Sequence, residues 1–442
     1  MTDPGAKPDT DVVFDPDTYQ REMPWQALAR LREREPVTWV EERPVDDWPA
    51  GPGFWAVWRH AEVKSVLKQP KLFSSYLGAT QIRDPATPDA LAYVRRMMLN
   101  MDPPEHSRIR GLLSRSFTPR TVARLARGIH TRARTLIDRA ADAAEVDFTS
   151  VAADLPVSTL ADILGVPDSD KYLLYDWANR VIGYQDSEYA VSDTVDRAAG
   201  TPMARAALAV RPTPGPDGRM PDPRTRRGIP DLYAYAHELA RHKRAHPGDD
   251  VMSILLAQVD DAGGRVSTEE FENLFWLFAV AGNETLRNGI PGGMYALANH
   301  PGQWRRLDED RSLLPSAVEE MLRWWTPVIH FRRTATADAE IAGQPVPAGD
   351  KVVVYFASGN RDPRVFPEPD WFQIARPRND HLAFGHGPHF CLGAHLARTQ
   401  MEAIFAAVLD RFSVVEPAGE VIRLRSNFQN GLKRLPIRWR PR

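Results

Sequence analysis

The chain has 442 residues, of which 43% are hydrophobic, 26% are charged and one is cysteine. This composition excludes a disordered tail, a collagen and a disulfide scaffold. Lys and Arg total 56 against 58 Asp and Glu, and the net charge of −2 argues against a general attraction to nucleic acid or to an anionic membrane. The sequence shows no signal peptide, no lipidation motif and no run of 18 apolar residues, so we expect a cytoplasmic protein without a membrane span.

The elements predicted along the chain are mostly helices. Apolar residues recur at three- and four-residue spacing, typical of amphipathic helices, in segments 24–35, 60–68, 105–114, 119–143, 231–246, 268–299, 315–325 and 391–412. Strand composition occurs in segments 37–40, 54–58, 352–356 and 435–439, and the first two are placed to pair. We therefore expect a mainly α fold with small β-sheets. It forms one domain over residues 21–442, after a flexible segment at residues 1–20.

One segment departs from this helical pattern through its composition. Residues 200–230 contain seven Pro, four Gly and six Arg. Proline removes backbone donors and fixes φ, so this composition predicts a loop without regular structure.

The sequence pattern of residues 267–299 predicts one long helix. It begins with a capping box, Ser267 with Glu270, and its length corresponds to roughly 48 Å of helix. The apolar middle is interrupted by the polar residues 282–285, and Pro291 is expected to kink the axis. Buried polar groups cost free energy unless they have partners, so the interruption indicates a functional role.

The lone cysteine lies in the sequence FGHGPHFCLGAHLAR, residues 384–398. Cys391 opens the predicted helix, where free backbone N–H groups and the helix dipole favour the thiolate. An inert buried cysteine would not explain the glycines or His386 and His389 around it. A catalytic nucleophile would need a base and an oxyanion site. A zinc site would need more thiolates or an HExxH spacing. A haem iron needs one axial thiolate, and glycines let the backbone approach the macrocycle.

Four motifs in this sequence resemble those of one family. Phe384, Gly387, Cys391 and Gly393 match the pattern FxxGxxxCxG, the haem-binding signature of the cytochrome P450 superfamily of haem-thiolate monooxygenases. Three more motifs follow the order of that family: MDPPEHSRIRGLLSRSFTPR at residues 101–120, AGNET at residues 281–285 and EEMLRW at residues 319–324. The resemblance implies the cytochrome P450 fold, a single large helical domain around a buried haem.

The resemblance also implies the cofactor and its contacts. The cofactor would be haem b, iron protoporphyrin IX, with Cys391 as the axial ligand of the iron. The residues expected at the haem are His106, Arg110, Arg333 and His389 at the propionates, and Ala281, Gly282 and Phe384 beside the ring. Arg332, next to Arg333, is an alternative propionate contact.

Glu320 and Arg323 match the structural ExxR pair of the family. Three residues apart, they can pair on one helix face. The family usually completes this pair with an arginine in a PxRF segment, where this chain has Trp371. Another residue or a water must therefore satisfy the pair.

Glu284 and Thr285 match the acid-alcohol pair with which the family delivers protons to dioxygen. A hydroxyl can hydrogen-bond the oxygen while a carboxylate relays protons from solvent. The alternative is structural, since a helical Thr often bonds back to its own backbone and a Glu can simply reach solvent.

The residues expected to line the substrate pocket follow from alignment with the family motifs. They are Val280, Ala281, Val328, Ile329 and Phe428, with Leu99 and Asn100 from the loop before the helix beside the haem. This lining suits an apolar small molecule. The stretch GNETLRN is similar to bacterial relatives that hydroxylate lipids and sterol side chains. It implies that one atom of O2 enters a lipid-like, steroid or terpenoid substrate. Residues 200–230 fall where the family has its substrate entrance and are expected to form a lid.

The electron supply is expected to come from other proteins. The haem domain accounts for the whole chain and leaves no room for a flavin or iron–sulfur module, so separate ferredoxin and ferredoxin reductase chains are implied. Arg115, Arg120 and Arg398 are the expected contacts of an acidic ferredoxin. Alternatives to the oxygenase are a secondary-metabolite tailoring oxidase, a haem-thiolate peroxygenase or isomerase, and a non-catalytic haem sensor. Glu284 and Thr285 favour the oxygenase, because a peroxide-driven enzyme or a sensor needs no such proton relay.

Overall fold

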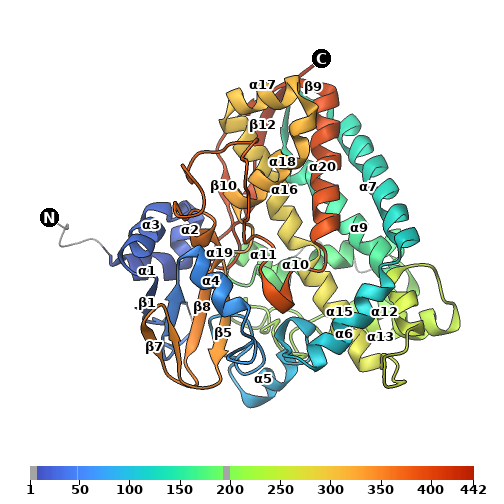
Figure 1. Ribbon diagram of the computed structural model, residues 1–442. Coiled ribbons are helices and arrows are strands. Elements are labelled where there is room, and N and C mark those ends of the chain that lie inside the picture. Colours follow the sequence, from blue (N-terminus) through green and yellow to red (C-terminus); the bar gives the residue numbers. More distant parts are fainter. Residues whose placement is uncertain (1–6, 47, 193–199) are drawn as a thin grey trace.

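The computed structural model describes residues 7–46, 48–192 and 200–442, which form a mainly helical molecule (Figure 1). The α-helices are α1 (Asp9–Phe14), α2 (Pro16–Arg21), α3 (Trp25–Arg34), α4 (His60–Leu67), α5 (Pro88–Val94), α6 (Glu105–Ser116), α7 (Pro119–Ala140), α8 (Phe148–Ala152), α9 (Asp154–Leu164), α10 (Tyr172–Ile182), α11 (Ser187–Val191), α12 (Pro202–Ala209), α13 (Pro230–Ala245), α14 (Val251–Ala257), α15 (Thr268–Ala281), α16 (Glu284–Asn299), α17 (Pro301–Glu309), α18 (Leu314–Trp325), α19 (Phe356–Gly359) and α20 (Ala394–Arg411).

The strands are short and gather in small sheets. They are β1 (Val37–Val40), β2 (Phe54–Val57), β3 (Phe73–Ser74), β4 (Glu145–Asp147), β5 (His330–Ala335), β6 (Ala339–Ile341), β7 (Gln344–Val346), β8 (Lys351–Tyr355), β9 (Phe412–Pro417), β10 (Ile422–Arg423), β11 (Leu432–Arg434) and β12 (Pro436–Pro441). The largest sheet has the order β1-β2-β8-β5-β3, and a second has the order β4-β12-β9. Trp55 on β2 lies opposite Val352 on the parallel strand β8, so segments far apart in the sequence meet in one sheet.

The helical part is built around the line of α15 and α16, and the large sheet lies at the opposite side of the molecule (Figure 1). One group of buried apolar side chains comes mainly from α9, α10, α13 and α15, and another from α7, α16, α18 and α20. Phe278 of α15 packs against both groups. The α15–α16 line therefore separates two cores, and its polar interruption falls between them.

The fold class predicted from the sequence is confirmed, and so is the pairing of β1 with β2, which is antiparallel. Two local predictions are wrong. In the predicted flexible segment 1–20, residues 9–20 instead fold into α1 and α2, which bury Val13, Phe14 and Tyr19. Residues 1–6 of that segment lie outside the described residues. Residues 200–230 are not irregular throughout, because α12 begins with Pro202 in its first turn. There the missing N–H of proline has no helical partner to lose.

No helix within the described ranges is long and apolar enough to cross a membrane.

Candidate active site

Most of the predicted site residues line one cavity. It encloses about 1620 Å³ of space free of protein atoms, part of it open to solvent, and most of its wall is apolar. The predicted residues in its wall are Leu99, His106, Arg110, Ala281, Gly282, Thr285, Val328, Arg333, Phe384, His389 and Cys391.

Cys391 lies in the loop before α20, not in the helix itself. The helix begins at Ala394, so the predicted helix start at residue 391 is wrong. Gly385 and Gly387 have φ angles of 68° and 71°, which glycine adopts without strain. A Cβ on Gly387 would lie 2.4 Å from the carbonyl oxygen of Leu67, so a side chain would not fit there. The loop is closed by the N–H of Cys391, which donates to the carbonyl oxygen of Phe384 (2.9 Å).

The Cys391 thiol is exposed to the cavity. Burial raises the pKa of this thiol, whereas a hydrogen bond from the Gly393 backbone and the charges of Arg110 and Arg398 act to lower that pKa. A buried thiol of this kind becomes a thiolate when a metal binds it. The described residues contain no cluster of three or more His, Cys, Asp or Glu side chains that could hold a metal ion. A metal at Cys391 would therefore need its other ligands from a cofactor.

Four basic side chains gather on the cavity wall. The rings of His106 and His389 lie 4.1 Å apart, centroid to centroid, and neither ring nitrogen of His106 has a hydrogen-bond partner in the described part of the chain. Burial, reinforced by neighbouring cations, lowers the pKa of His106 to about 4 and that of His389 to about 2. Burial also lowers the pKa of Arg333 to about 10, and Arg110 donates to the Phe390 carbonyl (2.6 Å).

These basic groups fit the carboxylates of a haem. Buried cations are costly unless an anion neutralises them, and carboxylates bind such groups through charge-assisted hydrogen bonds. The nearby carboxylate of Asp102 already accepts a hydrogen bond from the Ser75 N–H (2.8 Å). A cofactor with two propionates and an iron that takes one thiolate matches the donors present.

Arg332 and Arg333 occupy different environments because neighbouring residues of a strand point to opposite faces. Arg332 pairs with Asp84 (2.6 Å) and donates to the Ile82 carbonyl (3.2 Å). Arg333 lines the cavity. The predicted exchange of roles between them is therefore wrong, since Arg332 is already occupied.

The predicted long helix 268–299 is interrupted at Gly282 and Asn283, which separate α15 from α16. Pro291 lies inside α16, which continues past it, so the interruption is not at the proline. A Cβ on Gly282 would lie 2.9 Å from the Phe278 carbonyl oxygen and 3.1 Å from Leu160. A larger residue at position 282 would collide with these atoms, so glycine allows the close packing of the backbone in this part of the cavity wall.

Thr285 and Glu284 point in different directions. Thr285 lines the cavity, and its Oγ1 donates to the Ala281 carbonyl oxygen (3.1 Å). Glu284 does not line the cavity, and its side chain is 1% exposed. Its Oε2 lies 3.2 Å from Nη1 of Arg287, and that nitrogen also donates to Asn179 (2.7 Å). Burial raises the pKa of Glu284 despite the opposing charge of Arg287.

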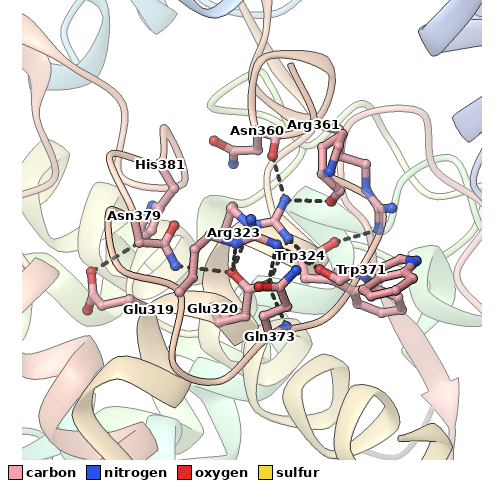
Figure 2. A network of polar contacts seen from close by, with 12 residues as sticks. Glu319, Glu320, Arg323, Trp324, Asn360, Arg361, Trp371, Gln373, Asn379 and His381 are labelled. Carbon is pink, nitrogen blue, oxygen red and sulfur yellow. Dashed lines mark hydrogen bonds and ion pairs between the residues drawn. The ribbon is translucent and has the colours of Figure 1, made fainter. Parts of the chain in front are cut away.

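Glu320 and Arg323 form a fully buried pair on α18 (Figure 2). Arg323 Nε and Nη2 donate to the two oxygens of Glu320 at 2.7 and 2.8 Å. The arginine missing at Trp371 is supplied by Arg376, whose Nε donates to Glu320 Oε2 (3.0 Å). Trp371 contributes its carbonyl oxygen to Arg376 (2.8 Å) and to Arg323 (3.2 Å), although the residue is 64% exposed. These hydrogen bonds keep the pKa of Glu320 below its usual range.

Four predicted pocket residues do not line the cavity. Val280 and Ile329 are buried in the hydrophobic core, on elements whose neighbouring residues Ala281 and Val328 line the cavity instead. Asn100 donates to the Val94 carbonyl oxygen (2.8 Å). Phe428 lies behind the wall, with its ring 5.7 Å from that of Phe331.

The sequence analysis missed several residues of the wall. Phe278 and Phe331 line it, as do Pro156, Thr159, Leu160 and Ile163 of α9. The spacing of these α9 residues, i, i+3, i+4 and i+7, is that of one helix face, a signal present in the sequence. Phe278 belongs to an apolar run with no such face, and nothing in the sequence distinguishes it.

Comparisons with known proteins match this geometry. A family model described as Cytochrome P450 matches residues 234–439. The steroid C26-monooxygenase of Rhodococcus jostii is 34% identical, covering 96% of this chain and 83% of that protein. The linalool 8-monooxygenase of Pseudomonas putida is 35% identical, covering 96% of this chain and 97% of that protein.

A solved structure supports the same match. The Mycobacterium marinum cytochrome P450 CYP268A2, in complex with pseudoionone, has a TM-score of 0.82 and 33% identity to this chain. The match covers 99% of this chain and 100% of that one.

Proposed function

This chain belongs to the cytochrome P450 family, and from that premise we propose that it hydroxylates a steroid or terpenoid held in the cavity above Cys391. The chain is a cytochrome P450 monooxygenase with haem b as its cofactor. The observation that carries the substrate class is the apolar wall, with Leu99, Val328 and Phe331, which lies in the same cavity as the cysteine. Its relatives act on a steroid and on linalool, both largely apolar molecules.

In this proposal each polar residue has one task. Cys391 would hold the iron, Arg110 and Arg333 would neutralise the propionates, and His106 and His389 would donate hydrogen bonds to them. When bound, haem supplies the dioxygen chemistry that inserts one oxygen atom into a C–H bond. The surrounding apolar side chains orient the substrate and exclude water, which strengthens the electrostatic interactions inside.

Thr285 and Glu284 supply protons to the cavity. The Thr285 hydroxyl lies at the cavity wall, and its proton must leave the Ala281 carbonyl oxygen before it can serve a group in the cavity. Burial raises the pKa of the Glu284 carboxyl group, which favours its protonated form, although the charge of Arg287 acts against this. Its side chain must turn from Arg287 toward Thr285, or a water must bridge them, before that proton reaches the cavity.

We propose that the electrons come from a separate ferredoxin and ferredoxin reductase. Arg398 pairs with Glu319 at 2.5 Å and is less available for docking than Arg115 and Arg120, which are exposed. An acidic ferredoxin would be attracted to these two side chains, and the attraction would weaken with added salt. The cytoplasmic location stays a prediction.

The decisive experiment combines a spectrum with product analysis. The haem-loaded, ferrous protein with carbon monoxide is expected to show the strongly red-shifted Soret band of thiolate ligation, and Cys391→Ser is expected to lose it. With NADH, ferredoxin and reductase, the wild-type protein is expected to hydroxylate a steroid or a terpenoid alcohol. A normal band without turnover of either class would contradict the substrate proposal. Turnover with hydrogen peroxide alone and none with NADH would contradict the monooxygenase electron supply.

A further inference from the structure

A second, smaller pocket lies behind the cavity wall. It encloses about 300 Å³ of space free of protein atoms, part of it open to solvent, and its mixed lining includes His330, Gln81, Arg83, Gln185, Asn427 and Phe428. This mixed lining contrasts with the apolar wall of the main cavity.

Two buried polar groups in this pocket have no partner. His330 is 2% exposed, and neither of its ring nitrogens has a hydrogen-bond partner in residues 7–46, 48–192 and 200–442. The same holds for Oε1 of Gln81. Buried polar groups in folded proteins nearly always have a partner, and leaving one unpaired costs about 1–3 kcal/mol. Both groups therefore point to something that binds between them.

Asn427, Gln185 and Arg83, three other polar residues of the pocket, already have partners. Asn427 donates to the Phe14 carbonyl oxygen (2.6 Å) and accepts from Gln185 (3.2 Å). Arg83 donates to the carbonyl oxygens of Pro49 (3.1 Å) and Arg43 (3.4 Å). The buried side-chain atoms of this lining that have no partner among the described residues belong to His330 and Gln81.

The unpaired groups of His330 and Gln81 carry no charge. Burial lowers the pKa of His330 to about 3, so the ring carries one N–H donor and one acceptor nitrogen at neutral pH. Gln81 Oε1 is an acceptor. A hydroxyl group can accept from the His330 N–H and donate to Gln81, whereas a carbonyl oxygen can only accept. Arg83 already donates to two backbone carbonyl oxygens, so a carboxylate would have to displace these contacts in order to pair with its guanidinium.

The pocket and the main cavity are separated by two aromatic rings. Phe331 lines the main cavity and Phe428 lines the small pocket, with ring centroids 5.7 Å apart. The His330 ring lies 5.6 Å from Phe428 on the other side. A turn of Phe428 would therefore join the two spaces. An elongated molecule could then reach from the small pocket into the cavity that contains Cys391.

We propose that His330 and Gln81 bind a neutral oxygen, a hydroxyl or a carbonyl group, at the end of the substrate remote from the carbon that is oxidised. This subsite rests on the proposed function and narrows its substrate class to elongated apolar molecules with one polar end. Oxidation then falls on the opposite, apolar end of the molecule.

The test uses the spin-state shift of the haem-loaded protein as a binding assay, with cholesterol and cholest-5-ene delivered in cyclodextrin. These two probes differ by the hydroxyl group alone. Wild-type protein is expected to bind cholesterol about tenfold more tightly than cholest-5-ene. His330→Leu is expected to remove this difference, His330→Gln to restore part of it, and Gln81→Leu to reduce it. The carbon monoxide spectrum of each variant reports whether it is folded.

Tyr355→Phe is the matched control. The Tyr355 ring lies 5.2 Å from that of His330, but this residue does not line the small pocket, so the discrimination should persist. Equal binding of both probes to wild-type protein, or equal weakening of both by His330→Leu, would overturn the subsite while leaving the proposed function standing. Absence of any shift with either probe would contradict the steroid class and the subsite together. Tighter binding of cholesterol sulfate that depends on Arg83 would instead assign the pocket to an anion.

Discussion

Thr285 and Glu284 illustrate how two adjacent residues of one motif serve different surroundings. Successive residues of a helix lie about 100° apart, so one side chain faces the cavity while the next enters the core. The Thr285 hydroxyl is held at the wall by the Ala281 carbonyl oxygen, and the Glu284 carboxyl group is held away by Arg287. The motif predicts both residue types but not this division.

Thr285→Ala is expected to bind haem normally and to divert electrons from NADH to hydrogen peroxide, because the hydroxyl proton is lost from the cavity. General acid catalysis contributes about 10²–10⁴-fold, so the fraction of NADH that ends in product should fall at least roughly tenfold. Paired measurements of NADH, peroxide and product report this fraction. Thr285→Ser keeps the hydroxyl and serves as the control. Tight coupling in the alanine variant would refute the role.

The buried histidines predict a pH dependence that differs between the haem-free and haem-loaded protein. The folded-state pKa of His106, about 4, lies below the unfolded value of 6.5, so the unfolded chain binds a proton that the folded chain does not. Folded haem-free protein should therefore lose stability as pH falls from 6.5 toward 4, by up to about 1.4 kcal/mol per pH unit for each such histidine.

Urea unfolding at pH 7, 6 and 5 measures this slope. Haem-loaded protein should show a shallower slope, because the propionates supply anions beside the histidines. His106→Gln should reduce the slope of the haem-free form. Equal slopes in the two wild-type forms would contradict the assignment of the basic cluster to the propionates.

Residue types with distinctive chemistry could be located from the sequence, whereas most apolar lining residues could not. Cys391 and His106 stand in motifs with fixed spacing, and both line the cavity. Val280 and Ile329 were expected there but lie in the core, because a shift of one residue turns a side chain to another face of its helix or strand. Phe331 lies on the face of β5 that lines the cavity, and only the folded structure shows which face of the strand that is.

At the scale of elements, the Glu320 and Arg323 pair connects α18 to the loop that follows α19. Arg323 donates to the carbonyl oxygens of Asn360 and Pro369, both at 2.8 Å, and Arg376 donates to that of Pro367 (2.7 Å). The buried charges thus hold a long stretch without regular structure (Figure 2). The sequence predicted that a partner was missing at Trp371. The sequence could not identify Arg376 as that partner, because the loop that brings Arg376 to Glu320 is seen only in the folded structure.

Arg376→Leu is expected to destabilise the protein by about 3–5 kcal/mol, since it leaves part of a buried carboxylate unpaired. Arg378→Leu, an exposed arginine of the same loop, should change stability little. Trp371→Ala should also have a small effect, because its contribution is a backbone oxygen. Thermal unfolding and haem retention report the difference. Similar losses for Arg376→Leu and Arg378→Leu would contradict this account of the network.

The break between α15 and α16 was foreseen in the sequence as a polar interruption, not as two helices. Periodicity continues across the break, and the strongest helix breaker in the segment, Pro291, lies elsewhere. The helices separate at Gly282 and Asn283. Asn283 is fully buried, and its side chain donates to the Leu174 carbonyl oxygen of α10 (3.5 Å). The spacing of apolar residues in the sequence cannot reveal such a tertiary contact.

At the scale of the molecule, the loop between α12 and α13 is fastened to the N-terminal part of the chain. The guanidinium of Arg224 lies 4.0 Å from the ring centre of Trp48 and 5.3 Å from that of Tyr184. Cation–π contacts of this kind contribute about 0.5–2 kcal/mol each. If residues 200–230 form the predicted lid, the contacts of Arg224 with Trp48 and Tyr184 would hold that lid closed.

Arg224→Leu is expected to raise the rates of both substrate binding and release by roughly fivefold, in line with loss of about 1 kcal/mol, with little change in Kd. Stopped-flow recording of the spin-state shift measures both rates. Arg227→Leu, an exposed arginine of the same loop, should leave them unchanged. Unaltered rates in the Arg224 variant would count against a lid at this loop.

The pairing of β2 with β8, and of β4 with β12, has a consequence for synthesis on the ribosome. The first partner of each pair emerges long before the second, and pairings between distant residues form slowly. His106 and Arg110 are likewise made well before Cys391. The haem site therefore cannot be complete until residues near the C-terminal end of the described chain have been made.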